Sequence, residues 1–268
     1  MRTIAVMNRK GGSGKTTTAV NTAAALAGLQ QPVLLIDVDP QGSASDWLDR
    51  EGTERGMREA FTVTGDLARF ATPTGTHGLE IVPSTPWLVS AEKSMQGDLS
   101  LGISRAIQRL PPRWAFVIID CPPSLSYLSI GVLMGVSELV IPVEAHSMAM
   151  TGAVAVIDEL PSVRALNPNL GSVCLLPCRV TRTRHARAVI ELLEAEYPHE
   201  IAASRIRETI KLAEAAEARQ PITEFAPDSV GTSDYRAFAG ELLTYDVPAA
   251  KASTSWWKSP LSALSGGR

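Results

Sequence analysis

Short apolar runs alternate along this chain with longer segments of helical composition. Runs at 3–8 (TIAVMN), 31–39 (QPVLLIDVD) and 114–120 (WAFVIID) predict buried strands, and shorter ones predict strands at 79–82, 137–143 and 172–176. Helices are predicted at 15–29, near 44–50 and 56–70, at 100–110, and near 147–160, 183–197, 208–219 and 233–245. This alternation, without an internal repeat, predicts one α/β domain over residues 1–245, with a mostly parallel, doubly wound sheet flanked by helices.

The turn between the first strand and the first helix reads RKGGSGKTT at residues 9–17. A phosphate-binding loop needs flexible backbone whose N–H groups point at a phosphate, then a lysine and a hydroxyl. Lys15 supplies the charge for the β- and γ-phosphates, and Thr16 supplies the hydroxyl for Mg²⁺. Arg9 stands where the general P-loop pattern has its first glycine, with Lys10 beside it, so this loop is a variant. We expect nucleotide contacts from Gly11, Gly12, Ser13, Gly14, Lys15, Thr16, Thr17 and, after the second strand, Gln41.

Two further predicted strands end on aspartates. Asp37 and Asp39 close the second long run, and Asp120 closes the third. Ligands of doubly wound sheets collect outside the carboxyl ends of the strands, so these acids can face one Mg²⁺–triphosphate. A loop cap is the alternative for any one of them. We predict Thr16, Asp37 and Asp120 as metal ligands, the aspartates acting partly through water because Mg²⁺ keeps much of its hydration shell.

The composition limits the possible classes of protein but does not indicate a particular chemistry. A chain of 268 residues can bury one large core, and a formal net charge of −3 neither requires nor excludes nucleic acid. The three cysteines make no disulfide framework or metal spacing, and the run SVCLLPC favours core packing. No apolar run approaches the ~18 residues of a membrane span, and no signal peptide precedes the first strand. We therefore expect a cytoplasmic protein, without an N-terminal operator-binding domain.

Three motifs, KGGSGKTT, DVDPQG and FVIIDCPPSL, resemble the nucleotide-site motifs of the ParA-type ATPases. This deviant Walker A group also includes MinD and the nitrogenase iron protein, whose pair of cluster cysteines has no convincing match here. The resemblance covers residues 2–245, and its later motifs favour the Soj/ParA branch. Those motifs are EIVPS at 80–84, ELVIPVEAHSMAMTG at 138–152 and IRETIKLAEAAEARQPI at 206–222.

The resemblance implies an ATPase that uses ATP and Mg²⁺. Lys10 resembles the signature lysine, which reaches across an ATP-bound homodimer to the partner's phosphates, a task suited to a compact charge on a flexible stem. Asp39 matches the residue that orients the attacking water. Lys10, Lys15 and Asp39 are therefore the expected catalytic residues. Hydrolysis should be slow in the monomer and stimulated by a ParB-like or other adaptor protein.

Basic residues gather late in the chain. Arg179, Arg182, Arg184 and Arg187 fall within nine residues that contain no acid. In Soj-like relatives, basic residues of this region and of the segment around Lys211 hold DNA non-specifically. A solvated helix face is the alternative for any single residue. As a cluster, Arg182, Arg184, Arg187 and Lys211 predict salt-sensitive binding of double-stranded DNA and association with the nucleoid.

Some features leave the interpretation open. His146 stands where relatives often have a glutamate, and Thr209 where the adenine-contacting segment often has asparagine. Residues 246–268 are rich in Ser, Ala, Gly and Pro and predict a flexible tail, in which Trp256-Trp257-Lys258 is suited to docking on the protein or a partner. Pro260 and sparse basic residues disfavour a membrane-binding helix, so no membrane partner is expected.

Together these features predict an ATPase that positions or segregates a cargo such as a chromosome, plasmid or protein organelle. A MinD-like regulator at a membrane is the first alternative. A small-molecule kinase or ligase is the second, although no acceptor-binding constellation favours it.

Overall fold

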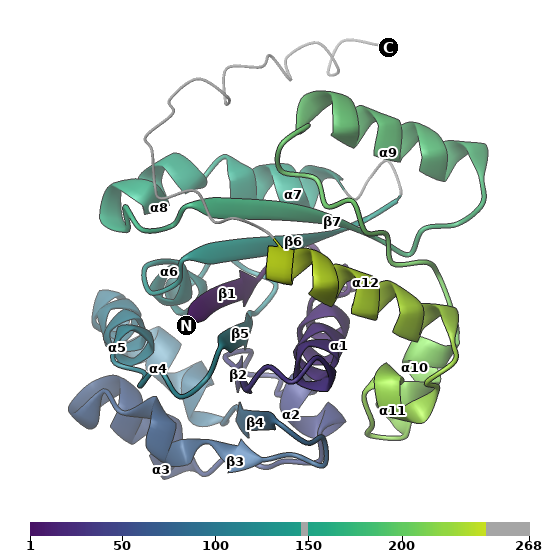
Figure 1. Ribbon diagram of the computed structural model, residues 1–268. Helices are drawn as coiled ribbons and strands as arrows, with labels where there is room; N and C mark the ends of the chain where they lie inside the picture. The colour runs from purple at the N-terminus through teal and green to yellow at the C-terminus, as the bar shows by residue number, and fades with distance from the viewer. Residues whose placement is uncertain (146–149, 245–268) are drawn as a thin grey trace.

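A seven-stranded sheet in the order β3-β4-β2-β5-β1-β6-β7 forms the centre of the computed structural model, which describes residues 1–145 and 150–244 (Figure 1). All neighbouring strands run parallel except the short edge strand β3, which is antiparallel to β4. The strands are β1 (Arg2–Val6), β2 (Val33–Asp37), β3 (Thr72–Pro73), β4 (Leu79–Val82), β5 (Phe116–Asp120), β6 (Glu138–Glu144) and β7 (Ser172–Cys178).

Helices cover both faces of the sheet and create two apolar cores. Side chains alternate along each strand, so that Ile4 and Val6 enter one core while Ala5 and Met7 enter the other. One face carries α1 (Lys15–Gly28), α2 (Ser43–Trp47), α10 (Lys211–Glu217), α11 (Ile222–Phe225) and α12 (Val230–Thr244). The other carries α3 (Glu54–Glu59), α4 (Trp87–Met95), α5 (Gly97–Gln108), α6 (Tyr127–Leu133), α7 (Met150–Ile157), α8 (Leu160–Leu166) and α9 (Arg184–Glu196).

The predicted fold class is confirmed, and the differences concern short elements. The expected helix near 56–70 is instead α3, a π-helical turn Ala60–Thr64 and a 3-10 turn Leu67–Phe70. Gly65 separates the two turns with a left-handed φ of 62°, which ends a regular helix. The helix expected near 147–160 is divided into α7 and α8. Helices α4, α6 and α11 and strand β3 are absent from the sequence-based expectation.

Some predictions fall on residues that the structure does not describe. His146 lies there, and so do the segment 246–268 and its Trp256-Trp257 pair. The division of the chain at residue 245 therefore stays a prediction. Among the described residues, no helix has the length and apolar character that crossing a bilayer requires.

The strand register brings the predicted acids together. Val6, the last residue of β1, pairs with Asp120 on β5, and Asp120 pairs with Asp37 on β2. The carboxyl ends of three central strands therefore meet at one edge of the sheet, where α1 also begins. This edge is where ligands of parallel α/β sheets bind.

Candidate nucleotide-binding site

The loop from Arg9 to Gly14 connects β1 to the first turn of α1. Gly12 and Gly14 have φ values of 74° and 85°, a left-handed conformation that would strain any larger residue. Gly14 is the N-cap of α1, and no side chain caps this end of the helix. The first-turn N–H groups are therefore available to an anion, which the helix dipole also favours.

Lys15 is held inside this loop. Its side chain is buried, and its Nζ donates a hydrogen bond to the carbonyl oxygen of Lys10 at 3.2 Å. Burial lowers the pKa of Lys15, while the neighbouring Asp120 and Asp39 oppose that shift. Lys15 is enclosed by the loop and lies near two acids, which is where a bound phosphate would need a positive charge.

Thr16 and Asp120 form a pair at the start of α1. The Thr16 Oγ1 donates to the Asp120 Oδ2 at 2.7 Å. The other oxygen, Oδ1, is buried and has no hydrogen-bond partner in the described part of the chain. A buried carboxylate oxygen without a partner is costly, and beside a hydroxyl it suits a hard cation such as Mg²⁺.

Two carboxylates lie side by side in this buried region. Burial raises the pKa of Asp120 well above its usual range, and the neighbouring Asp37 raises it further. The described residues contain no cluster of three or more His, Cys, Asp or Glu side chains that could enclose a metal ion. The pair of buried carboxylates fits Mg²⁺, because this ion uses one or two protein ligands and takes the rest from water and phosphate oxygens.

Asp37 organises the loop that follows β2. Its Oδ2 accepts from the backbone N and the Oγ of Ser45 at 2.8 and 2.6 Å, and its Oδ1 accepts from the Asp39 N at 3.2 Å. Ser84, at the end of β4, donates its backbone N–H to the Ser45 Oγ. Burial raises the pKa of Asp37 to about 6. Both oxygens are engaged within the chain, so the metal role of Asp37 stays a prediction.

We expect Asp120→Asn to stabilise the nucleotide-free protein at neutral pH. The folded-state pKa values of both acids lie above the unfolded values. The contribution of Asp37 to stability is therefore present below about pH 4 and lost as pH rises through about 6, and the contribution of Asp120 is likewise lost as pH rises through its own raised pKa. Removing one charge should raise the free energy of unfolding by about 1–2 kcal/mol at pH 7.5, and by less at pH 4.5.

Denaturant titrations at the two pH values would measure this effect. Asp46→Asn is the matched control, because Asp46 is an exposed acid on α2 and should show neither the gain nor its pH dependence. A less stable Asp120→Asn at pH 7.5 would contradict the electrostatic interpretation.

Asp39 lies in the same loop with one carboxylate oxygen unengaged. Its Oδ1 accepts from the backbone N of Gln41 at 2.9 Å, and its own carbonyl accepts from the Ser84 Oγ at 2.6 Å. Within the described residues, its Oδ2 makes no hydrogen bond. The loop therefore fixes Asp39 at its backbone and at one oxygen, and leaves the other oxygen for a water molecule or ligand.

Lys10 does not point into the loop as Lys15 does. Its Nζ forms an ion pair with the Glu144 Oε2 at 2.7 Å, at the carboxyl end of β6. Sequence reasoning missed Glu144, although the rule that identified Asp37 and Asp120, an acid at the end of an apolar strand, applies to it equally.

A cavity of about 500 Å³ borders the phosphate loop at Gly12, Gly14 and Thr17. Thr209, from the segment that the resemblance links to adenine, lines it together with Ile210 and Trp47. The remaining lining is a mixture of apolar side chains and charged ones, among them Arg179, Arg207 and Glu208. Its position and mixed lining suit a planar base attached to a phosphate chain.

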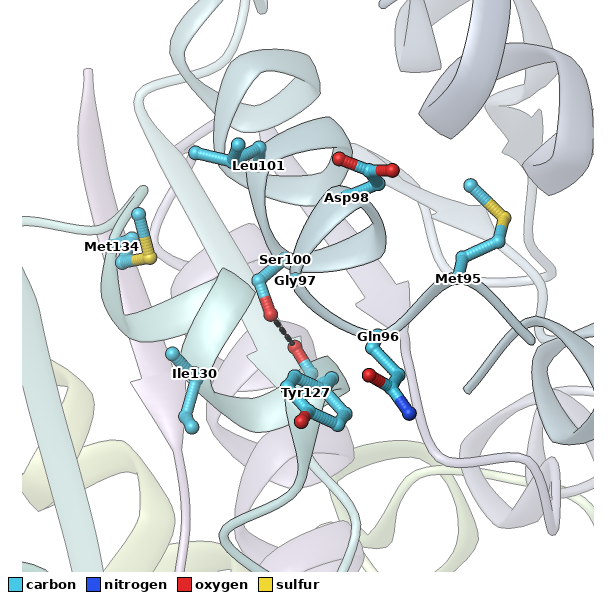
Figure 2. A pocket seen from close by; sticks show the side chains of 9 residues that line it. All are labelled: Met95, Gln96, Gly97, Asp98, Ser100, Leu101, Tyr127, Ile130 and Met134. Atoms are coloured by element: carbon cyan, nitrogen blue, oxygen red, sulfur yellow. Dashed lines mark hydrogen bonds between the residues drawn. The ribbon is translucent and has the colours of Figure 1, made fainter. Parts of the chain in front are cut away.

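A separate, open hollow of about 580 Å³ lies between α5 and α6 (Figure 2). Met95, Leu101, Ile130 and Met134 line it, and Ser100 donates its hydroxyl to the Tyr127 carbonyl at 2.6 Å beneath it. None of the residues predicted for the nucleotide site lines this hollow.

The predicted DNA contacts lie at two adjoining segments. Arg182, Arg184 and Arg187 are exposed around the start of α9, and within the described chain none of them forms an ion pair. Lys211 is exposed at the start of α10, where Glu214 partly neutralises it at 2.7 Å. A β-bridge between Val180 and Arg207 joins the two segments.

Comparison with known proteins decides the family. A model of the AAA domain family matches residues 1–171. The chain is 36% identical over 246 residues to the chromosome-partitioning ATPase Soj of Thermus thermophilus, covering 91% of this chain and 96% of that protein. It is 31% identical over 253 residues to the chromosome partitioning protein ParA of Myxococcus xanthus, covering 92% and 89%. The chain belongs to the ParA/Soj family of ATPases.

Membership of the ParA/Soj family agrees with the site geometry. The solved structure of cobyrinic acid a,c-diamide synthase from Mycobacterium smegmatis, with bound ATP analogue and magnesium, is also similar. Its TM-score is 0.75 at 28% identity, and the match covers 91% of this chain and 94% of that one. The predicted membership of the ParA/Soj ATPase family is confirmed, while the roles of individual site residues stay predictions.

Proposed function

We propose that this chain is an ATP- and Mg²⁺-dependent ATPase that dimerises, binds DNA non-specifically and positions or segregates an intracellular cargo. The observation that carries the proposal is the difference in surroundings between the two lysines of the loop. Lys15 is enclosed by the phosphate loop, whereas the side chain of Lys10 is 37% exposed at the mouth of the site. The first serves a phosphate in its own subunit, and the second is free of that task.

In this proposal each group of the site has a separate role. Lys15 and the first-turn N–H groups of α1 bind the β- and γ-phosphates, and the cavity lined by Thr209 takes the base. Thr16 and Asp120 would hold Mg²⁺, which would supply positive charge to neutralise the phosphates. Asp39 orients the attacking water through its unengaged oxygen. Phosphoryl transfer depends mainly on such positioning and charge neutralisation, so no covalent step by the protein is needed.

Dimerisation would complete the site. Lys10 would reach the phosphates of a second copy, which makes the dimer depend on ATP and keeps hydrolysis slow in the monomer. The exposed arginines around α9 would then be doubled across the dimer, so that DNA affinity depends on ATP as well. An adaptor of the ParB type would stimulate hydrolysis and release the protein from the nucleoid. The partitioning functions of the Soj and ParA relatives support this cycle.

DNA co-sedimentation over a salt series tests the proposal. Wild type should sediment with DNA in ATP but not in ADP, and Lys10→Ala should not sediment in either nucleotide. Binding that is equal in ATP and ADP would contradict the dimer switch. If no variant binds DNA with ATP, the DNA-based function is wrong, and vesicles and small-molecule acceptors become the next candidates.

We expect Arg184→Ala and Arg187→Ala each to weaken DNA binding uniformly across sequences. Each removes a cation that would neutralise about one DNA phosphate per subunit, so the salt slope of binding should fall by about one unit for each such phosphate. ATPase activity without DNA should not change. Arg55→Ala on α3 is the matched control, because Arg55 is exposed but lies on another helix and pairs with Glu59. An unchanged salt slope in both variants would place the DNA surface elsewhere.

A further inference from the structure

A row of four charged side chains connects the phosphate loop to the base cavity. Glu144 pairs through Oε2 with Lys10 at 2.7 Å and through Oε1 with the Arg179 Nη1 at 2.9 Å. Arg179 also pairs with Glu208 at 3.1 Å, and both of these residues line the cavity. The charges alternate in sign along the row, so Lys10 is neutralised within its own subunit.

The local backbone holds this row in place. Asn8 donates its side-chain amide to the Pro142 carbonyl of β6 at 2.8 Å and accepts from the backbone N of Lys10 at 2.9 Å. The loop containing Lys10 is thereby tied to the strand that ends at Glu144. Arg179 directly follows β7 and has a left-handed φ of 51°, which is uncommon for a residue with a side chain.

Glu144 has two cations although one would satisfy it. The residue is only 5% exposed, so its carboxylate needs a charged partner to remain ionised. Burial raises the pKa of Glu144, but hydrogen bonds from Lys10 and Arg179 outweigh burial and leave the pKa below its ordinary value. If the lysine departs, Arg179 still holds the carboxylate, so that departure does not leave a bare buried charge.

We infer that Glu144 is a positioning residue that holds Lys10 in its own subunit until the ATP-bound dimer forms, with Arg179 retaining the carboxylate afterwards. The inference rests on the proposed dimerising function. In the dimer, Lys10 exchanges its contact with Glu144 for phosphate oxygens of the other copy. Glu144 therefore competes with dimerisation and keeps the nucleotide-bound monomer from pairing too readily.

Substitutions of Glu144 and of Arg179 should change dimerisation in opposite directions. Glu144→Gln keeps the shape of the side chain but removes the charge that retains Lys10, so dimers should form at lower protein concentration. Arg179→Gln leaves Lys10 as the sole cation on Glu144, so dimers should need higher concentration. A merely structural role would make both variants dimerise more weakly, because each breaks an ion pair.

Glu138→Gln is the matched control for Glu144→Gln. Glu138 is a buried acid at the other end of the same strand, and it pairs with the Arg2 Nε at 2.6 Å. The substitution therefore breaks a comparable ion pair without touching Lys10. It should leave the dimer equilibrium unchanged.

Sedimentation equilibrium in saturating ATP and Mg²⁺ tests the inference, with hydrolysis blocked by Asp39→Ala in every variant. Glu144→Gln should lower the dimer dissociation constant roughly three- to tenfold, the range expected for one partly exposed charge pair. Far-UV circular dichroism of each variant, measured on separate samples without nucleotide, reports whether the variant is folded. If Glu144→Gln misfolds, Arg179→Gln becomes the test. A dimer dissociation constant of Arg179→Gln at or below that of the parent protein would then refute the inference.

The possible outcomes distinguish the inference from the proposed function on which it rests. If the parent protein dimerises with ATP and Glu144→Gln dimerises equally or more weakly, the positioning role is wrong and the proposed function stands. If neither forms dimers, both are wrong. If Glu144→Gln alone dimerises, the ion pair is a stronger restraint than the tenfold estimate and the inference holds.

Discussion

Asp39→Ala should lower ATP hydrolysis by about two orders of magnitude or more and leave ATP binding intact. The reason is geometric: one oxygen of Asp39 is fixed by the Gln41 backbone, and the other makes no hydrogen bond within the described residues. Lys15, Thr16 and Asp120, which would hold the phosphates and the metal, are unaltered by the substitution. ATP should therefore remain bound unhydrolysed, and the ATP-bound dimer should accumulate.

The measurement is phosphate release at saturating ATP, combined with ATP affinity and oligomeric state. Asp46→Ala is the matched control, because Asp46 is an acid on the neighbouring helix α2 that pairs with Arg219 at the surface. It should hydrolyse ATP as wild type does. If Asp39→Ala loses ATP binding instead, its side chain supports the loop rather than the water, and the catalytic assignment is wrong.

Sequence patterns predicted that the phosphate loop and the strand-end acids meet at one edge of the sheet, because these parts are local or periodic. The phosphate loop depends on adjacent glycines, and Asp37 and Asp120 terminate apolar runs that can only be buried strands. The register of β2 and β5 then places those two acids side by side, as the strand-end rule requires. The positions of these acids depend little on other tertiary contacts, because parallel strands present their carboxyl ends at one edge of the sheet.

Contacts between distant segments could not be predicted in the same way. Ser45 and Ser84, which together anchor Asp37 and its loop, lie 39 positions apart and have no distinctive pattern. Glu144 itself satisfies the strand-end rule, but its contacts with Lys10 and Arg179 could not be predicted, because those residues lie on other loops, 134 and 35 positions away. Helices α4 and α6 were missed because short helices are hard to distinguish from strands or loops in sequence, and their packing rather than their propensity stabilises them.

The missed contacts and the predicted ones differ in purpose. Those that sequence revealed are predicted to bind a nucleotide, as the phosphate-loop pattern requires. Those that only the structure reveals restrain the predicted residues: Ser45 restrains Asp37, Ser84 restrains Asp39, and Glu144 restrains Lys10.

Lys15→Ala should weaken ATP and ADP binding by about a hundredfold, the loss expected when a charge-assisted contact to phosphate is removed from a buried site. The lysine is enclosed, and its Nζ donates a hydrogen bond to the Lys10 carbonyl. Calorimetric titration with ADP measures the effect on the monomer, independently of dimerisation or hydrolysis. Lys93→Ala, which removes an exposed lysine from α4, is the control and should bind ADP normally.

Lys15→Arg separates charge from geometry in the same assay. The variant keeps the positive charge beside Asp120 and Asp39, but a planar guanidinium is wider than an ammonium and the loop encloses this position closely. Most of the affinity should therefore be lost in Lys15→Arg as well. Wild-type ADP affinity in Lys15→Arg would mean that the loop opens to admit a larger group, and the β-phosphate would then be held mainly by the backbone N–H groups of Gly12 to Thr17. Wild-type affinity in Lys15→Ala would remove the lysine from the binding site altogether.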